Sequence, residues 1–258
     1  MSKSIGLAKT AAAALAAATL SSTSLEAASS PPRTVVLVHG AFADGSSWSK
    51  VIPLLEAKGL RVVAVQNPLS SLKSDVDAAE RVIKAQQGDV ILVGHSWAGV
   101  VISQAGVNEK VKALVYVAAF APPKGVSINE LGKGQPPAPW LSELQADSAG
   151  YLRLSDRAVA EYFAQDLSPQ DIKVIAATQG PAFSGIFDEK ITQAAYQTKP
   201  SWYVVADQDG MIAPAAQRAM AKAIKANTTE VSASHVVMLS KPSEVAQVIL
   251  DAVVATGD

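Results

Sequence analysis

The strand-like segments of this chain are continuous apolar runs rather than runs that alternate apolar and polar residues. In the first half they are TVVLVHG, RVVAVQN, DVILVGH and VKALVYVAAF. A strand that is apolar on both faces must be covered on both faces, so these runs favour a parallel sheet between two layers of helices. Segments of helical length and periodicity lie between the runs: WSKVIPLLEAKG, SDVDAAERVIKAQQ and AGVVISQAGV.

A second set of segments of the same kind closes the chain. The strand-like runs SWYVVADQD and TTEVSAS alternate with the helical patterns PAAQRAMAKAIKA and PSEVAQVILDAVV. Strands and helices in alternation predict an α/β fold with a doubly wound, mostly parallel sheet of about six strands. We assign this core to residues 33–121 and 200–258.

The middle of the chain, residues 122–199, breaks this alternation. It opens with proline and glycine in APPKG and GKGQPPAPW and has no convincing buried strand, whereas SDRAVAEYFAQ and SPQDIKVIAATQG have helical patterns. In the second of these, Ser168 is the predicted N-cap, Pro169 the first helical residue and Asp171 the reciprocal partner in a capping box. We therefore predict a helical cap inserted between two parts of the core.

The first 28 residues differ in composition from the rest of the chain. Lys3 and Lys9 precede an apolar, alanine-rich run, and a small polar segment with Glu26 follows it. This order is typical of a secretory signal peptide cleaved after Ala27 or Ala28, and the alternative is a disordered leader. A signal peptide would place the mature protein in the periplasm or outside the cell. The run is too short to span a membrane, and no later stretch supplies about 18 consecutive apolar residues, so we expect no stable membrane anchor.

Composition excludes several classes of function. Of the 258 residues, 49% are hydrophobic and 17% are charged, and the formal net charge is −1. Without a basic cluster to neutralise phosphates, nucleic-acid binding has no electrostatic support. The chain has no cysteine, which excludes disulfides, thiolate metal sites and a cysteine nucleophile. No two of its three histidines have metal-ligand spacing, so we expect neither a metal site nor a cofactor.

The segment GHSWAG joins a predicted buried strand directly to a helical pattern, with Ser96 in the turn between them. A strand, a sharp turn and a helix with serine at the apex form a nucleophile elbow, in which the hydroxyl stands clear of the sheet. Small residues are needed around the serine because the strand and helix backbones nearly touch. Gly94 meets this need before the serine, and Ala98 followed by Gly99 is a slight departure from G-x-S-x-G. Ser96 is therefore the candidate nucleophile.

A serine nucleophile needs a base, and in this topology the chain order is serine, acid, histidine. Of the three histidines only His235 follows Ser96, in the loop SASHVVM. An imidazole titrates near neutrality and can take the serine proton and return it to a leaving group. The acid that orients the histidine comes from ADQDGMIAP, after a predicted strand. Asp209 is preferred because it lies at the turn, and Asp207 is the alternative.

Two loops are candidates for the backbone N–H groups that would bind an oxyanion. Trp97, directly after the serine, supplies one of them. Ala41 in HGAF supplies the other, because Gly40 lets the chain turn at that point. The two remaining histidines, His39 and His95, are interpreted as structural residues that hydrogen-bond to backbone around the site.

Four segments together resemble the compact α/β-hydrolases that include plant methyl-salicylate esterases, hydroxynitrile lyases and related bacterial esterases. These segments are VVLVHGAF, GHSWAG, VADQDGMIAP, and SHVVML with KPSEVA. The resemblance covers nearly all of the chain after the leader and is loose only in the cap. It implies an α/β-hydrolase fold, a triad of Ser96, Asp209 and His235, and oxyanion donors at Ala41 and Trp97.

Two features bear on the substrate. The lyases of that family have a lysine immediately after the catalytic histidine, whereas this chain has Val236, which favours an esterase. Aromatic residues are frequent in the cap and beside the oxyanion loops, which favours an apolar pocket. The candidate pocket residues are Phe42, Trp140, Phe163, Phe183 and Phe187.

The sequence thus predicts a cofactor-free serine hydrolase that cleaves small to medium apolar carboxylic esters through an acyl-enzyme. Two alternatives stay open, because one fold hosts many chemistries. One is a hydroxynitrile lyase or a perhydrolase that uses the same triad on a different bond. The other is a ligand receptor built on a hydrolase fold.

Overall fold

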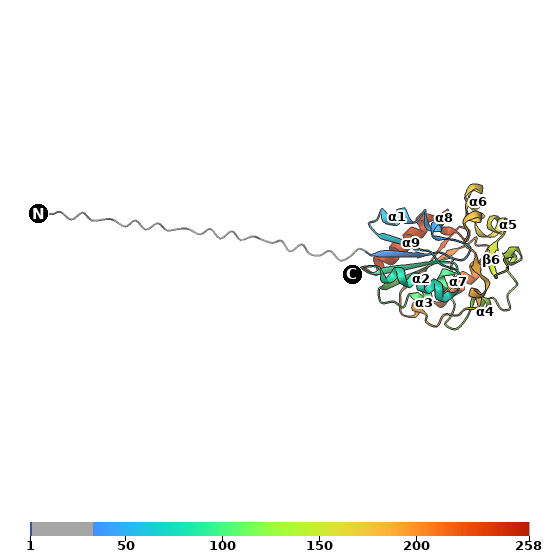
Figure 1. Cartoon of the computed structure of the whole chain (residues 1–258), viewed down its shortest axis with the longest axis horizontal. Coiled ribbons are helices and arrows are strands. Elements are labelled where there is room, and N and C mark those ends of the chain that lie inside the picture. Colours follow the sequence, from blue (N-terminus) through green and yellow to red (C-terminus); the bar gives the residue numbers. More distant parts are fainter. Residues whose placement is uncertain (2–32, 258) are drawn as a thin grey trace. The chain divides into compact units, whose positions relative to one another are not determined.

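The computed structural model describes residue 1 and residues 33–257 of the chain. Its centre is a sheet that lies between helices (Figure 1). The sheet has six strands in the order β2-β1-β3-β4-β8-β9, and every neighbouring pair is parallel. The strands are Thr34–Val38 (β1), Arg61–Val65 (β2), Val90–His95 (β3), Val111–Val117 (β4), Ser201–Ala206 (β8) and Asn227–Val231 (β9). Each corresponds to a predicted run, so the predicted fold class is confirmed. The predicted leader lies outside the described residues, Met1 apart, and stays a prediction.

Burial explains why the inner strands have unbroken apolar sequences. Strands β1, β3, β4 and β8 are buried along almost their whole length. The edge strands β2 and β9 are half-buried or exposed at every position except their last residue. An inner strand of a parallel sheet has no face in water, so alternation with polar residues would bury polar side chains.

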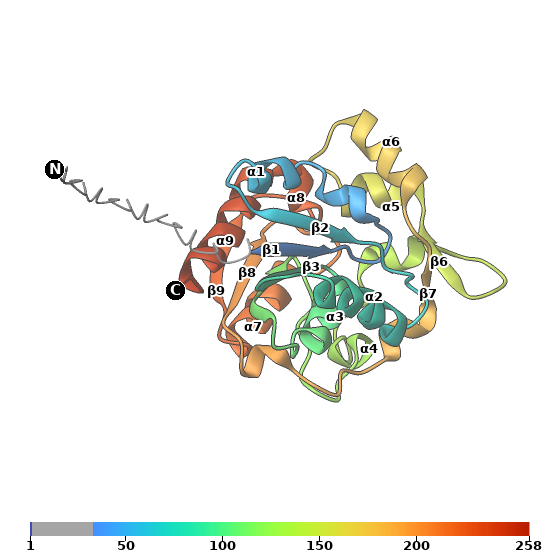
Figure 2. The same cartoon turned by 60° about the vertical axis from the view of Figure 1, so that its left-hand side comes forward.

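Helices cover both faces of the sheet (Figure 2). On one face lie α1 (Ile52–Glu56) and α9 (Pro242–Ala255), which follows the short α8 (Val237–Ser240). The other face carries α2 (Leu72–Lys84), α3 (Ala98–Ala105) and α7 (Pro214–Ala223). This layering is the doubly wound arrangement that the sequence predicts. Along residues 33–257 no helix combines the length and the apolar character needed to cross a membrane.

The insertion between β4 and β8 contains a small sheet that the sequence pattern does not predict. Strands β5 (Leu144–Ala146), β6 (Tyr151–Leu154) and β7 (Ala182–Phe183) pair antiparallel in the order β5-β6-β7. They are only two to four residues long, too short to show a strand period. The insertion also contains short helices joined by turns and loops: α4 (Ile128–Leu131), η2 (Pro139–Glu143), α5 (Asp156–Ala158), the π-helix η3 (Val159–Phe163), α6 (Pro169–Thr178), η4 (Ser184–Asp188) and η5 (Ala195–Gln197).

The start of α6 agrees with half of the predicted capping box. Pro169 is the first helical residue, and the Ser168 hydroxyl accepts the N–H of Asp171 at 3.1 Å. Within the described residues the carboxylate of Asp171 does not bond back to the backbone of Ser168, so that part of the prediction is wrong. It lies instead 3.8 Å from the Lys50 ammonium, after the 3-10 helix η1 (Gly45–Trp48) of the core.

The arrangement of the sheet determines where a site can form. The carboxyl ends of the parallel strands point toward the insertion (Figure 2). In open α/β sheets ligands bind outside these ends, where loops from several strands meet. The loops after β1, β3, β8 and β9 carry the predicted triad and the predicted oxyanion donors.

Candidate active site

Ser96 lies in the turn between β3 and α3 with a left-handed backbone conformation, at a φ of 54°. Such a conformation is strained for a residue other than glycine and persists only where its surroundings hold it. A β-carbon on Gly94 would stand 2.7 Å from the Ala98 carbonyl oxygen, and one on Gly99 would stand 2.0 Å from the Phe120 carbonyl oxygen. The tight position after the serine is therefore residue 99, and the methyl group of Ala98 fits as the first residue of α3.

Ser96, His235 and Asp209 form a continuous hydrogen-bonded chain. His235 Nε2 lies 2.8 Å from Ser96 Oγ, and His235 Nδ1 lies 2.7 Å from Asp209 Oδ2. The three residues are buried, with exposed fractions of 8%, 1% and 6%. An ionised carboxylate only accepts hydrogen bonds, so Nδ1 carries the imidazole proton and Nε2 is free to accept the serine proton.

The two candidate acids, Asp207 and Asp209, lie in different environments. Asp209 is buried against His235, whereas Asp207 is exposed to solvent. Asp209 Oδ1 also accepts the backbone N–H groups of Met211 and Ile212, at 2.7 and 2.9 Å. These bonds stabilise the charged carboxylate and fix its orientation.

Gln217 completes the donors around Asp209 and is not among the residues predicted from the sequence. Its Nε2 donates to Asp209 Oδ2 at 2.7 Å and to the Ile212 carbonyl oxygen at 2.8 Å, while its Oε1 accepts the Ala206 N–H at 3.0 Å. Gln217 shares the buried face of α7 with Met220, three residues further on. A glutamine on the apolar face of a helix needs a buried partner, and this was the available signal in the sequence.

His95 is bonded to the backbone of His235. His95 Nε2 lies 2.9 Å from the His235 carbonyl oxygen, and the two ring centroids are 4.6 Å apart. Among the described residues His95 Nδ1 has no hydrogen-bond partner. Burial, with the nearby His235, holds the pKa of His95 well below its ordinary value. His95 therefore stays neutral and donates from Nε2 to the His235 carbonyl, in agreement with the structural interpretation.

His39 fixes the loop after β1. Its Nε2 accepts the Asn67 N–H at 2.8 Å, its Nδ1 lies 2.9 Å from the Gly40 carbonyl oxygen, and its own carbonyl accepts the Asn67 side chain at 2.9 Å. Burial lowers the pKa of His39, which favours the neutral ring.

Among the described residues no three histidine, aspartate or glutamate side chains are grouped so that they could hold a metal ion.

The loop after β1 brings Ala41 to the Ser96 turn. Gly40 packs against Ser96, and the next turn of the chain places Phe42 at a φ of 60°. Within residues 33–257 neither the Ala41 N–H nor the Trp97 N–H donates to another backbone group. Backbone N–H groups without a backbone partner, next in sequence to Gly40 and Ser96, are suited to bind a developing negative charge.

Comparison with known proteins identifies the family of this chain. A model of the alpha/beta hydrolase family matches residues 35–248. The chain belongs to this family. It is 28% identical over 254 residues to methylesterase 2 of Arabidopsis thaliana, covering 86% of this chain and 95% of that protein. It is 29% identical over 247 residues to the pyrethroid hydrolase of Sphingobium wenxiniae, covering 84% and 86%.

A solved structure supports the same fold. The crystal structure of polyneuridine aldehyde esterase superposes on this α/β-hydrolase with a TM-score of 0.77 at 22% sequence identity, over 85% of this chain and 98% of that chain. The α/β-hydrolase fold implied by the four motifs is therefore confirmed.

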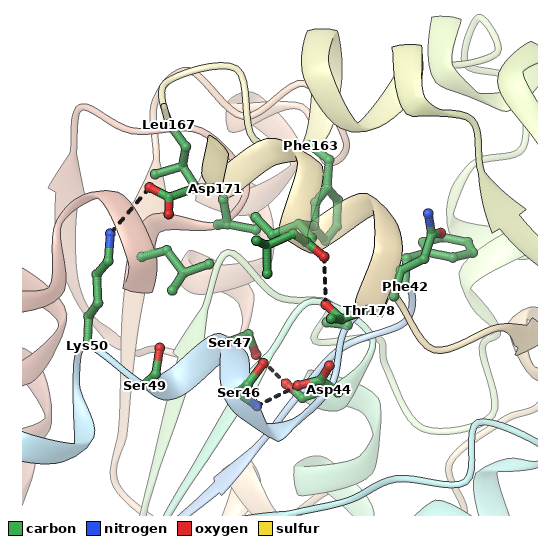
Figure 3. Close-up of a pocket in the computed structure, with 16 residues that line it drawn as sticks. Phe42, Asp44, Ser46, Ser47, Ser49, Lys50, Phe163, Leu167, Asp171 and Thr178 are labelled. Carbon is green, nitrogen blue, oxygen red and sulfur yellow. Dashed lines mark hydrogen bonds and ion pairs between the residues drawn. The ribbon is translucent and has the colours of Figure 1, made fainter. Parts of the chain in front are cut away.

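A cavity of about 280 Å³ in this α/β-hydrolase lies between the loop after β1, η1 and α6 (Figure 3). Its apolar wall includes two predicted pocket residues, Phe42 and Phe163, together with Val236. Ser96 is not one of the described residues that line the cavity. Phe163 does line it, and the centroid of its ring lies 5.2 Å from the centroid of the His235 ring. Its polar rim includes Asp44, Ser46, Ser49, Lys50, Asp171 and Thr178.

The other three predicted pocket residues lie outside this cavity. Trp140 packs edge-on against Phe42, with ring centroids 6.5 Å apart, and Phe187 packs edge-on against Trp97 at 5.9 Å. Both therefore pack against rings of the loops after β1 and β3. Phe183 packs against an aromatic ring of β6 and is 36% exposed, so the structure does not bring it to the site.

Proposed function

We propose that this α/β-hydrolase cleaves carboxylic esters, with Ser96 as nucleophile, His235 as general base and acid, and Asp209 as the residue that orients His235. The observation that carries the proposal is the buried chain of hydrogen bonds from Ser96 Oγ to the Asp209 carboxylate, at 2.8 and 2.7 Å. A hydroxyl is a weak nucleophile at neutral pH, and a base within hydrogen-bond reach takes its proton as it attacks. The methylesterase and the pyrethroid hydrolase among its relatives support this class of reaction.

Acylation begins when Ser96 Oγ attacks the ester carbonyl carbon and its proton passes to His235 Nε2. The imidazolium that forms is stabilised by the Asp209 carboxylate, whose orientation is fixed by the backbone of residues 211 and 212 and by Gln217. The negative charge on the carbonyl oxygen is received by the N–H groups of Ala41 and Trp97. Each such donor is worth roughly 3 kcal/mol of barrier.

Collapse of the tetrahedral intermediate breaks the bond to the alcohol. His235 gives its proton to the departing oxygen, which leaves as a neutral alcohol, and the acyl group remains on Ser96. A water molecule then takes the place of the alcohol, and the same steps release the acyl group. His235 takes a proton from the water as it attacks the acyl carbon, and returns it to Ser96 Oγ as the acid leaves.

The surroundings favour small to medium apolar esters. The cavity of about 280 Å³ lies just below the usual range of ligand pockets, roughly 300–1,000 Å³. Its inner wall, formed by Phe42, Phe163 and Val236, is apolar and adjoins the oxyanion loop and His235. The acyl or alcohol group of an uncharged ester can pack against this wall without burying an unpaired charge.

The test is hydrolysis of p-nitrophenyl esters from acetate to decanoate, with Ser96→Ala as the matched variant. We expect turnover of the shorter esters and a loss of roughly 10⁴-fold or more in the variant. An inert wild type, or a variant that keeps its rate, contradicts the proposal. Cyanide release from cyanohydrins, halide-dependent oxidation and ligand binding without turnover then test the lyase, the perhydrolase and the receptor.

A further inference from the structure

Asp75 is a buried carboxylate that the proposed chemistry does not use. It lies on α2 and is completely buried. Its Oδ2 accepts the indole N–H of Trp97 at 2.8 Å, and its Oδ1 accepts the backbone N–H of Leu69 at 2.8 Å. Burial of a carboxylate costs free energy unless strong hydrogen bonds compensate it. The position of Asp75 beside the residue that follows the nucleophile therefore needs an explanation.

The backbone partner of Asp75 is attached to the cap. Leu69 has a left-handed backbone conformation, at a φ of 55°, and its carbonyl oxygen accepts the Phe183 N–H at 2.8 Å. Three residues further on, the Leu72 N–H donates to Glu189 Oε2 at 3.0 Å. The cap segment 183–189 is thus bonded at both ends to residues 69–72, at the start of the helix that carries Asp75.

The side-chain partner of Asp75 contacts the same cap segment. The ring of Phe187 packs edge-on against the Trp97 indole, with centroids 5.9 Å apart. These contacts form a closed cycle. The Asp75 carboxylate bonds to the Trp97 indole, the indole packs against the cap segment, and the cap segment bonds to Leu69, whose N–H donates back to Asp75. A change at one member of this cycle moves the other members, because packed side chains have few alternative arrangements.

We propose that Asp75 is a positioning residue of the oxyanion site, acting through the indole of Trp97. The inference rests on the proposed function, since it assigns the Trp97 N–H a role in that reaction. The indole and this N–H belong to one residue directly after Ser96. A bond that fixes the indole therefore limits the rotation of the backbone that carries the N–H. Donors held in place before the reaction stabilise the transition state more than donors that must reorganise.

The charge state of Asp75 is consistent with this role. Burial raises the pKa of Asp75 to about 6, with a smaller contribution from the negative charge of Glu189, while the bonds from Trp97 and Leu69 oppose the shift. At neutral pH the group is therefore a carboxylate, which accepts both bonds at once. An asparagine in its place has one acceptor oxygen, and its NH₂ group must face one of the two donors.

The experiment compares the wild type with Asp75→Asn, Trp97→Phe and the double variant, using p-nitrophenyl acetate. Each single variant is expected to lower kcat by roughly 10- to 100-fold, less than deletion of an oxyanion donor, with KM changed by less than about threefold. The double variant should be no slower than the slower single variant, because both changes remove the same bond. An arylboronic acid, which forms a tetrahedral adduct with the serine, should bind more weakly by the same factor as kcat falls.

Two results would overturn the proposal. The first is an unchanged kcat in Asp75→Asn, and the second is losses that multiply in the double variant, which means that Asp75 does not act through the indole. Asp77→Asn, an exposed position on the same helix, is the control. If Asp75→Asn does not fold, Trp97→Phe carries the test, and a wild-type kcat in that variant overturns the proposal. Failure of the proposed function differs, because then the wild type itself hydrolyses no ester.

Discussion

A β-carbon on Gly40 would stand 2.7 Å from the β-carbon of Ser96, so the loop after β1 and the turn after β3 are in direct contact. The same atom would stand 3.0 Å from the His95 carbonyl oxygen, a backbone atom of an inner strand that cannot easily move. Only glycine fits at this position. Its lack of a side chain allows the loop that carries Ala41, the next residue, to contact the turn that carries Ser96.

Gly40→Ala is therefore expected to separate the two loops. We expect kcat/KM for p-nitrophenyl acetate to fall by roughly 100-fold or more, because Ser96 and the Ala41 N–H no longer face the same carbonyl group. Gly132→Ala is the matched control, since the nearest atom to its added β-carbon is 3.7 Å away. Ester hydrolysis and thermal unfolding of both variants check this prediction. Wild-type activity in Gly40→Ala contradicts the role proposed for Ala41.

The two aspartates after β8 form a natural matched pair. Asp209→Asn removes the charge that stabilises the imidazolium and favours the wrong tautomer of His235, so kcat should fall by about 10⁴-fold. Asp207→Asn changes an exposed side chain two residues away and should leave kcat within about twofold. Steady-state kinetics of both variants decide the assignment, and a larger loss in Asp207→Asn reverses it.

The raised pKa of Asp75 predicts a pH dependence of stability. Because its pKa is about 6 in the folded protein and 3.8 in the reference state, the folded protein holds this proton more tightly than the unfolded chain. The stabilisation is fully present below pH 3.8 and is lost as the pH rises to about 6, by about 3 kcal/mol in all. Asp75→Asn lacks this dependence. The free energy of unfolding of the variant, minus that of the wild type, should therefore increase with pH.

Urea unfolding of both proteins between pH 4 and pH 7 measures this difference, and Asp77→Asn serves as the control on the exposed face of the same helix. The change of shape that asparagine introduces is the same at every pH, so only the slope of the difference bears on the prediction. A difference that stays constant across this range contradicts a raised pKa for Asp75.

The core of the fold follows from the sequence because its strands are covered on both faces. A strand that is covered on both faces has an unbroken run of apolar residues, and such runs predict the inner strands. Ser96 was located for a related reason, since the turn that strains it demands small neighbours such as Gly94, which are visible in the sequence. The strands of the cap have two to four residues and leave no periodic pattern.

The residues that bond to the site from neighbouring helices cannot be predicted from the sequence, for a different reason. Asp75 and Gln217 lie within helices, and their partners, Trp97 and Asp209, lie on other segments. A hydrophobic pattern predicts which face of a helix is buried, but not which polar group of a neighbouring segment packs against that face. The choice between Asp207 and Asp209 had the same limit, because both follow one strand and only one faces His235.

The cavity beside the triad predicts a selective effect on chain length. Ile175 on α6 lines the cavity, and replacing it with tryptophan places a larger ring in that space. If the cavity holds the acyl chain, kcat/KM for the octanoate ester should fall by about tenfold relative to the acetate ester, whose acyl group does not extend so far. Val254→Trp, at a position on α9 that is 77% exposed, adds the same ring outside the site and should leave the ratio unchanged. An unchanged ratio in Ile175→Trp assigns the acyl chain to another part of the site, because the cavity would then be filled without cost to the longer ester.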